Sequence, residues 1–326
     1  MNVVVVVEHD RGALSPASLE ALTAARPLGA VHAVTIGAAA DSLVDQLAAH
    51  GASTVHQVHH DLLTDYGPEA WGEAVAQLVT LLAPDAVIAT GTDRGNEVIA
   101  HVAAILDQPM VANCTAIEPA ADGGPWKLIR VRWGGSLLER CELTAATPLL
   151  TVAHHAFEGS PSPVEAAIAE FVPELDASLA RSMVVDRVER AAGVTLGTAP
   201  VVVGGGRGVG SPEAFAPLED LAALLGGVVG CSRAVTNNGW RNHTDQVGQT
   251  GTRIAPDLYF ACGISGAIQH WVGAMASKKI LAINIDPDAN MVTKADYAVI
   301  GDLHKVVPAI AAEIRRRRTL TSVLVT

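Results

Sequence analysis

A glycine-rich turn is the first segment whose residue types could do chemistry. The apolar run at residues 201–203 leads into glycines at positions 204, 205, 206, 208 and 210, with Arg207 among them. Glycine lets the backbone approach an anion closely, an arginine adds a charged donor, and a helix after the turn offers unpaired N–H groups. The pattern predicts a phosphate-binding turn. A purely structural turn stays open as the alternative, because neither G-x-G-x-x-G nor G-x-x-x-x-G-K-S/T occurs.

Three further segments carry small and polar residues that suit the same chemistry. They are QVGQTG at residues 246–251, GISGAIQH at residues 263–270 and AINIDP at residues 282–287. The last two lie at the ends of predicted strands, and ligands of open α/β sheets bind at that edge. Ser265 is predicted to head a helix, where its hydroxyl and the N–H groups behind it could hold a diphosphate. The plainer alternatives are an ordinary N-cap for Ser265 and a core histidine bonded to backbone for His270.

Alternating strands and helices must position these segments. In the first half, strands are predicted at residues 3–7, 31–36, 54–58 and 86–89, and helices at residues 15–26, 68–82 and 96–106. This alternation is typical of a parallel sheet with crossover helices. Residues 126–150, interrupted by Gly134 and Gly135, predict antiparallel strands. The loop at residues 90–95 could touch a partner, although capping the next helix is the preferred interpretation.

A domain boundary is predicted near Gly193, after two loop-like stretches. Beyond it, strands are predicted at residues 201–203, 258–261 and 280–285, and helices at residues 212–225, 266–275 and 303–316. The predicted fold class is therefore α/β, with domains at residues 1–192 and 193–326. Each domain is expected to be built on a mainly parallel sheet flanked by helices.

Composition and charge exclude several classes of protein. Hydrophobic residues make up 49% of the 326 residues but aromatic residues only 4%, which suits helix-covered parallel sheets. No apolar run approaches the roughly 18 residues of a spanning helix, so membrane insertion is not expected. The net charge of -12 argues against nucleic-acid binding. Because Met1 leads directly into a strand-like run without a signal-peptide pattern, we expect a cytoplasmic protein.

The cysteines and the arginine cluster receive structural interpretations. Cysteine spacing shows neither a C-x-x-C pair nor clustering, so buried thiols and no metal site are predicted for Cys114, Cys141, Cys231 and Cys262. The four arginines at residues 315–318 are expected to form the solvated end of the last helix.

Taken together, the segments of the second half resemble the C-terminal domain of the electron-transfer flavoprotein alpha subunit, also called the FixB family. The resemblance extends from Gly205 through Ser232-Arg233, QVGQTG, GISGAIQH and Asn284 to ADY at residues 295–297 and GDLHKVVP at residues 301–308. QVGQTG upstream of GISGAIQH is a highly specific pair. Residues 4–26 resemble the N-terminal strand and helix of the family, so the resemblance covers essentially the whole chain.

The resemblance implies an electron carrier without substrate chemistry of its own. Its second domain would be a Rossmann-like fold holding one FAD, with the flavin facing a beta subunit in a heterodimer. Its first domain would resemble adenine-nucleotide α-hydrolase folds and contact the partner. Electrons would come from acyl-CoA dehydrogenases, as in fatty acid beta-oxidation, or from other flavin dehydrogenases, and pass singly to a quinone oxidoreductase or similar acceptor. The beta subunit could carry AMP or a second FAD.

Site residues follow from the matching positions of the family's motifs. FAD contacts are implied for Arg207, Ser232, Arg233, Val247, Gly248, Gln249, Thr250, Ser265, Gly266, Ala267, Ile268, Gln269, His270, Asn284, Asp302 and Leu303. Arg233 would lie over the isoalloxazine, Thr250 near its N5 and His270 near its C2 carbonyl. A flavin that gains one electron collects charge around N1 and the C2 carbonyl, so cations and donors there stabilise it. A full positive charge at about 4 Å would shift its potential by up to roughly 170 mV.

Departures from the family pattern lie near the expected flavin. Asn237 stands where an aspartate is common, residues 241–243 add polar character, and Gly210 replaces a usual lysine. These changes leave the fold prediction intact and bear on the potential and the partner.

Three rival functions remain to be weighed. An NAD-dependent oxidoreductase would need a strict glycine spacing and an acid about 20 residues beyond the turn, whereas Glu219 and Asp220 lie closer and inside a predicted helix. A nucleotide-binding regulatory protein is suggested by the first domain alone, without the phosphate-binding residues of an active hydrolase. A hydrolase is not favoured, because the sequence contains no G-x-S-x-G elbow.

Overall fold

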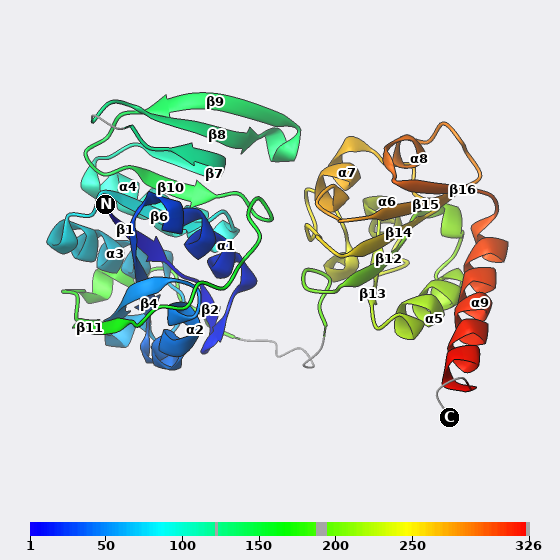
Figure 1. Cartoon of the computed structure of the whole chain (residues 1–326), viewed down its shortest axis with the longest axis horizontal. Helices are drawn as coiled ribbons and strands as arrows, with labels where there is room; N and C mark the ends of the chain where they lie inside the picture. The colour runs from blue at the N-terminus through cyan, green and yellow to red at the C-terminus, as the bar shows by residue number, and fades with distance from the viewer. Residues whose placement is uncertain (121–122, 187–193, 324–326) are drawn as a thin grey trace. The chain divides into compact units, whose positions relative to one another are not determined.

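The computed structural model describes residues 1–120, 123–186 and 194–323, and the chain forms two compact units (Figure 1). One unit comprises Met1–Trp133 and Leu137–Glu189, and the other comprises Gly134–Ser136 and Arg190–Thr326. The boundary predicted near Gly193 lies outside the described residues. None of the helices in the described ranges combines the length and the apolar character needed to cross a membrane.

A mainly parallel sheet forms the centre of the first unit. Its spatial order is β11 (Ala167–Phe171), β5 (Ala52–Val58), β4 (Ala30–Ile36), β1 (Asn2–Val6), β6 (Ala86–Thr90), β10 (Leu149–Val152), β7 (Met110–Glu118), β8 (Trp126–Arg132) and β9 (Leu137–Leu143). Strands β7, β8 and β9 pair antiparallel, which confirms the predicted hairpin. The prediction was wrong for Leu149 and Leu150, since β10 pairs parallel with β6 and β7. All of β10 is buried, as is typical of a central parallel strand.

Helices cover both faces of this sheet. They are α1 (Pro16–Ala25), α2 (Val44–Ala48), α3 (Pro68–Leu82) and α4 (Asp93–Leu106). Side chains of β1 alternate between two cores, because successive residues of a strand point to opposite faces. Val3 and Val5 share a core with Leu22 of α1, whereas Val4 and Val6 share one with Leu78 of α3. Burial on both faces explains the unbroken valine run.

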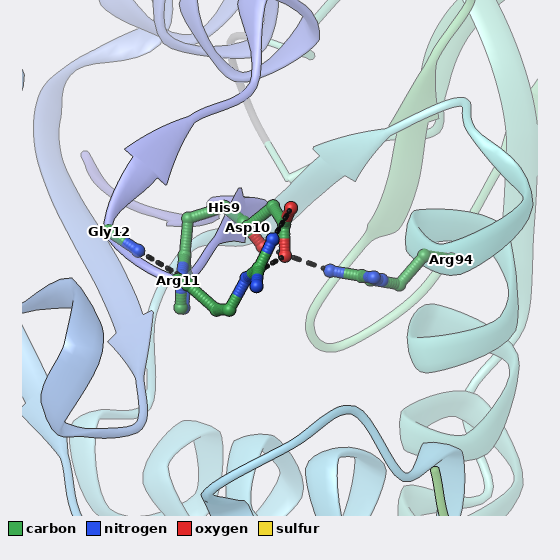
Figure 2. Close-up of polar contacts among 5 residues, drawn as sticks. All are labelled: His9, Asp10, Arg11, Gly12 and Arg94. Carbon is green, nitrogen blue, oxygen red and sulfur yellow. Dashed lines mark hydrogen bonds and ion pairs between the residues drawn. The ribbon is translucent and has the colours of Figure 1, made fainter. Parts of the chain in front are cut away.

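Hydrogen bonds stabilise the edge of the sheet where β1 ends. There, β2 (His9–Asp10) and β3 (Ala13–Leu14) form a small hairpin, and Figure 2 shows how Arg94 of α4 reaches it. The Arg94 guanidinium donates to the His9 carbonyl oxygen at 3.0 Å. The Thr92 hydroxyl accepts the Gly95 N–H at 3.0 Å, so residues 90–95 cap a helix that begins at Asp93 rather than at the predicted Asn96. The capping interpretation of this loop is thereby confirmed.

The second unit is built on a wholly parallel sheet within the described residues. Its spatial order is β13 (Val228–Cys231), β12 (Val201–Gly205), β14 (Leu258–Cys262), β15 (Ile280–Asn284) and β16 (Tyr297–Ile300). Helices α5 (Ala216–Leu224), α6 (Arg233–Asn237), α7 (Ile268–Ala274), α8 (Asn290–Lys294) and α9 (Leu303–Val323) connect or flank the strands. The chain runs from β12 to β13 on one side and then to β14 on the other. This reversal places a switch point at the carboxyl ends of β12 and β14.

Two structural interpretations of the sequence need correction. Helix α9 continues to Val323, so the arginine cluster lies inside the helix rather than at its end. Arg316 and Arg317 pair with Glu313 one turn away, which supports the helix through this stretch. Cys114, Cys231 and Cys262 are buried as predicted, and burial raises the pKa of each thiol to about 12. Cys141 is only half-buried.

Candidate functional site

The glycine turn after β12 packs against the loop after β14. Gly206 N–H donates to the Cys262 carbonyl oxygen at 2.8 Å, and Gly208 N–H donates to the Gly263 carbonyl oxygen at 3.1 Å. A Cβ on Gly206 would lie 2.1 Å from the Gly263 oxygen, so only glycine permits this approach. The α-helix predicted to follow the turn closely begins only at Ala216, after short 3₁₀ segments. These glycines therefore have a structural role, and the turn does not open directly into a helix N-terminus.

A cavity of about 560 Å³ lies at the carboxyl edge of the second sheet. Loops that follow β12, β13, β14 and β15 all contribute to its wall. The predicted site residues that line it are Arg207, Ser232, Arg233, Ser265, Gly266, Ala267, Gln269, His270 and Asn284. Further residues of the singled-out segments that were not among the predicted FAD contacts also line it, namely Gly208, Gly263, Ile264, Ile285 and Asp286, as do Ala234 and Ala289, which lie outside those segments. Ala234 follows β13 and Ala289 lies in the loop after β15, so their position at strand ends was the signal that could have found them.

Other predicted site residues lie outside the cavity wall: Val247, Gly248, Gln249, Thr250, Ile268, Asp302 and Leu303. Val247 and Leu303 are buried in the two cores of the unit. Gln249 N–H donates to the Gln269 carbonyl oxygen at 2.7 Å, which holds the QVGQTG loop beside α7. The exposed Thr250 hydroxyl accepts from the Gln246 amide at 3.0 Å. Asp302 caps α9 by accepting the His304 N–H at 2.9 Å.

Ser265 does not head a helix. Helix α7 begins at Ile268 with Ala267 at the N-cap position, and Gly266 has a φ of +79° between Ser265 and that cap. A left-handed residue cannot continue a right-handed helix, which is why the predicted start is wrong. The Ser265 side chain is exposed at the cavity and forms no hydrogen bond with the described residues. Its hydroxyl is therefore available to a ligand even though it is no helix cap.

His270 is buried at the cavity and bonded to a side chain. It is 6% exposed, and its Nε2 lies 2.8 Å from the Tyr259 hydroxyl. Burial lowers its pKa to about 4, so the ring is neutral at pH 7, while the Val247 backbone acts in the opposite direction. Its Nδ1 completes no hydrogen bond with the described residues. His270 is thus a buried core histidine, as the plainer alternative held, and the Tyr259 hydroxyl, outside the motif, is a partner that the alternative did not include.

Tyr259 could have been found from its place in the sequence. It stands in the otherwise apolar strand β14, where a buried hydroxyl must find a partner. Gly204 on the neighbouring strand β12 makes room for it, since a Cβ there would lie 2.3 Å from the tyrosine oxygen. By leaving room for Tyr259, Gly204 indirectly helps to position His270.

The cavity is suited to an anionic ligand. Arg207 and Arg233 line it, and neither forms an ion pair with any described residue. Unpaired guanidinium groups at a cavity favour phosphate, and the buried His270 adds a neutral ring nitrogen. Asn284 holds the wall, donating from its amide to the Ile264 carbonyl oxygen at 3.1 Å. These residues fit an anionic dinucleotide cofactor.

The two acids considered for an NAD-dependent oxidoreductase form ion pairs, and so does Arg241, one of the departures from the family pattern. Glu219 pairs with Arg241 at 2.6 Å, and Arg241 also pairs with Asp245 at 3.0 Å. Asp220 pairs with Arg315. Since these acids hold helix and loop contacts, neither is free to recognise a ribose.

Comparison with known proteins agrees with this arrangement. Residues 195–275 match the family model described as the electron transfer flavoprotein FAD-binding domain, and residues 3–190 match that of the electron transfer flavoprotein domain. The chain is 36% identical to the electron transfer flavoprotein subunit alpha of Mycobacterium tuberculosis over 97% of this chain and 99% of that protein. It is 33% identical to the subunit alpha of Thermoanaerobacterium thermosaccharolyticum, over 96% and 97%. It is also 33% identical to the protein FixB of Bradyrhizobium diazoefficiens, over 97% and 89%.

The fold and the site thus define a two-unit α/β flavoprotein with an FAD-binding second half. Both regions match models of one kind of redox carrier, and the relatives are aligned over nearly their full lengths. The chain belongs to the alpha-subunit family of electron transfer flavoproteins.

Proposed function

We propose that this chain pairs with a beta subunit, holds one FAD in the cavity of its second unit and carries electrons singly between a dehydrogenase and a respiratory acceptor. The observation that carries the proposal is the cavity at the sheet edge, where a buried histidine meets two guanidinium groups that form no ion pair within the described part of the chain. FAD supplies the redox chemistry when it is bound. The donor is an acyl-CoA dehydrogenase or another flavin dehydrogenase, and the acceptor is a quinone oxidoreductase or a similar protein in contact with the cytoplasm.

The two arginines have separate tasks in this proposal. Arg207 follows β12 and Arg233 follows β13, so they enter the cavity from neighbouring strand ends. Arg207, the glycine turn and Ser265 bind the diphosphate. Arg233 lies by the isoalloxazine, where an unpaired positive charge favours a more negative ring system. Both side chains are exposed without the cofactor, so solvent screening keeps their effect below that of a buried charge.

The tautomer of His270 follows from counting hydrogen-bond partners. If the Tyr259 O–H donates to Nε2, the ring carries its proton on Nδ1 and only that N–H lacks a partner. If Nε2–H donates instead, both the tyrosine hydrogen and the Nδ1 lone pair lack partners. The first arrangement leaves fewer buried groups unsatisfied. We infer that Tyr259 positions His270 as a neutral donor through Nδ1, available to a carbonyl of the flavin.

The remaining predicted contacts come from loops beside the cavity. Thr250 and its neighbours in the loop at residues 246–251 reach the flavin through backbone or hydroxyl groups, and Asp302 and Leu303 border it at the start of α9. The Rossmann-like character of the second unit is part of the same proposal.

Counting flavins in the purified heterodimer tests the function. We would co-express the chain with an electron transfer flavoprotein beta subunit from the same organism, remove loose nucleotide by dialysis, and determine FAD per heterodimer by absorbance and extraction. One FAD per heterodimer, lost in an Arg207→Ala and Arg233→Ala double variant, supports the proposal. Two FAD, one surviving the double variant, place a second flavin in the beta subunit, whereas AMP there leaves a single FAD. A colourless heterodimer that takes up no FAD on reconstitution refutes the function.

A further inference from the structure

A second group of chemically active side chains lies in the first unit. Glu20 of α1 and two consecutive histidines, His154 and His155, meet after β10. One potential ligand atom from each of the three side chains lies within 4.8 Å of the others. Glu20 is only 7% exposed. The proposed electron carrier has no use for this group, which belongs to a different unit from the FAD cavity.

The backbone holds His155 in an unusual conformation for this cluster. His155 has a φ of +62°, a region that residues with a side chain seldom adopt. The Glu20 carboxylate accepts the His155 backbone N–H at 2.7 Å, which fixes the loop against α1. The rings of His154 and His155 stack with centroids 3.8 Å apart, so the two side chains leave the loop on the same side. Neighbouring residues in an extended strand would point apart.

His155 also has a buried ring nitrogen without a partner. Its Nδ1 lies 3.5 Å from a Glu20 carboxylate oxygen, while its Nε2 is buried and forms no hydrogen bond within the described residues. The Glu20 carboxylate therefore lies beside the ring, and Nε2 is a buried nitrogen that is open to a further partner.

A simple ion pair between Glu20 and His155 would not satisfy this ring. Protonation at both nitrogens would turn Nε2 into a buried donor that still lacks an acceptor. A neutral ring leaves a buried acceptor without a donor. Either state leaves a polar group unsatisfied, and buried polar groups normally have partners. A metal ion at Nε2 would give this buried nitrogen a partner.

We propose that Glu20, His154 and His155 bind one divalent transition metal ion of the zinc type. Two imidazole nitrogens and one carboxylate oxygen form a set that zinc accepts at about 2.0–2.2 Å, with water in the fourth position. The nitrogen lone pairs of two stacked rings point in parallel directions and do not converge on one ion. The rings, whose planes are 21° apart, must therefore turn when the ion binds. The bound ion links α1 to the loop after β10 and stabilises the first unit.

Zinc binding to the full-length, chelator-treated chain tests this site. We would titrate Zn²⁺ by calorimetry and by competition with a chromophoric chelator, comparing the wild type with Glu20→Gln and His155→Gln. Each variant is expected to bind at least about tenfold more weakly. Glu20→Gln keeps an acceptor for the His155 N–H, so folding should survive, and thermal unfolding without metal verifies this. His32→Gln is the matched control, since His32 stacks on His56 without a carboxylate partner.

The outcomes separate the proposed site from chance binding. One equivalent of Zn²⁺ that weakens in both test variants and not in the control supports the site, as does a zinc-dependent rise in the unfolding temperature that disappears with His155→Gln. Equal affinity in the wild type and both test variants would mean adventitious binding by other histidines only, and would overturn the proposal. No binding by the wild type at micromolar zinc would overturn it as well. The FAD content of all variants should stay unchanged, so this result is independent of the proposed function.

Discussion

Burial of His270 predicts a pH-dependent stability of the second unit. The pKa of a histidine is 6.5 in an unfolded chain and about 4 for His270. Below pH 6.5 the unfolded chain binds a proton that the folded unit refuses, so stability falls as pH decreases. Because one pKa unit is worth about 1.4 kcal/mol, the folded unit loses up to ~3 kcal/mol between pH 6.5 and pH 4 through this residue. Above pH 6.5 the contribution is constant.

The assay compares pH profiles rather than single stabilities. We would measure urea unfolding of the FAD-free chain at several pH values from 4.5 to 7.5, using pulsed hydrogen exchange and mass spectrometry to isolate peptides of the second unit. His270→Gln is expected to flatten the profile by ~2.5 kcal/mol over this pH range, whatever its stability at pH 7.5. His304→Gln, at an exposed position, is the control and should leave the profile unchanged.

A clear result would refute the reasoning. If His270→Gln and the wild type lose the same stability between pH 7.5 and pH 4.5, the ring is not held neutral by burial. A direct NMR titration that places the pKa of His270 near 6.5 would have the same meaning, and the inference that it is a neutral donor would fall with it.

Three further substitutions test the cavity. Arg233→Ala should lower the first one-electron potential of bound FAD by up to roughly 170 mV, less with screening, and unchanged couples in spectroelectrochemistry would contradict its assignment. Tyr259→Phe should lower the unfolding free energy by about 1–3 kcal/mol and weaken FAD retention, because its histidine partner loses its orientation; full retention would argue against the positioning role. Gly206→Ala should force the turn away from Gly263 and lower the unfolding temperature, whereas Gly124→Ala, which has ordinary space, should leave it unchanged. Equal effects would count against the close approach.

Elements with a strong local pattern could be predicted from the sequence. The helix at residues 68–82 was predicted with the observed bounds, because proline begins it and apolar residues recur at helical spacing. The valine run of β1 and the buried runs of β4 and β6 were equally clear. Strands β7, β11, β13 and β16 were missed, since most are short or only partly buried and carry no clean period. The family followed from motifs such as GISGAIQH, whose specificity does not depend on knowing where each element ends.

Contacts between distant segments required the folded chain. Residues 204 and 259 meet because β12 and β14 are neighbours, and that pairing decides which residue His270 contacts. The approach of Gly206 to Gly263, the starts of α5 and α7, and the meeting of Glu20 with residues 154–155 likewise depend on how loops pack at strand ends. Local residue types govern the backbone's preferred conformation and the chemistry each side chain offers. The free energy of packing, summed over partners far apart in the chain, selects which of those side chains meet.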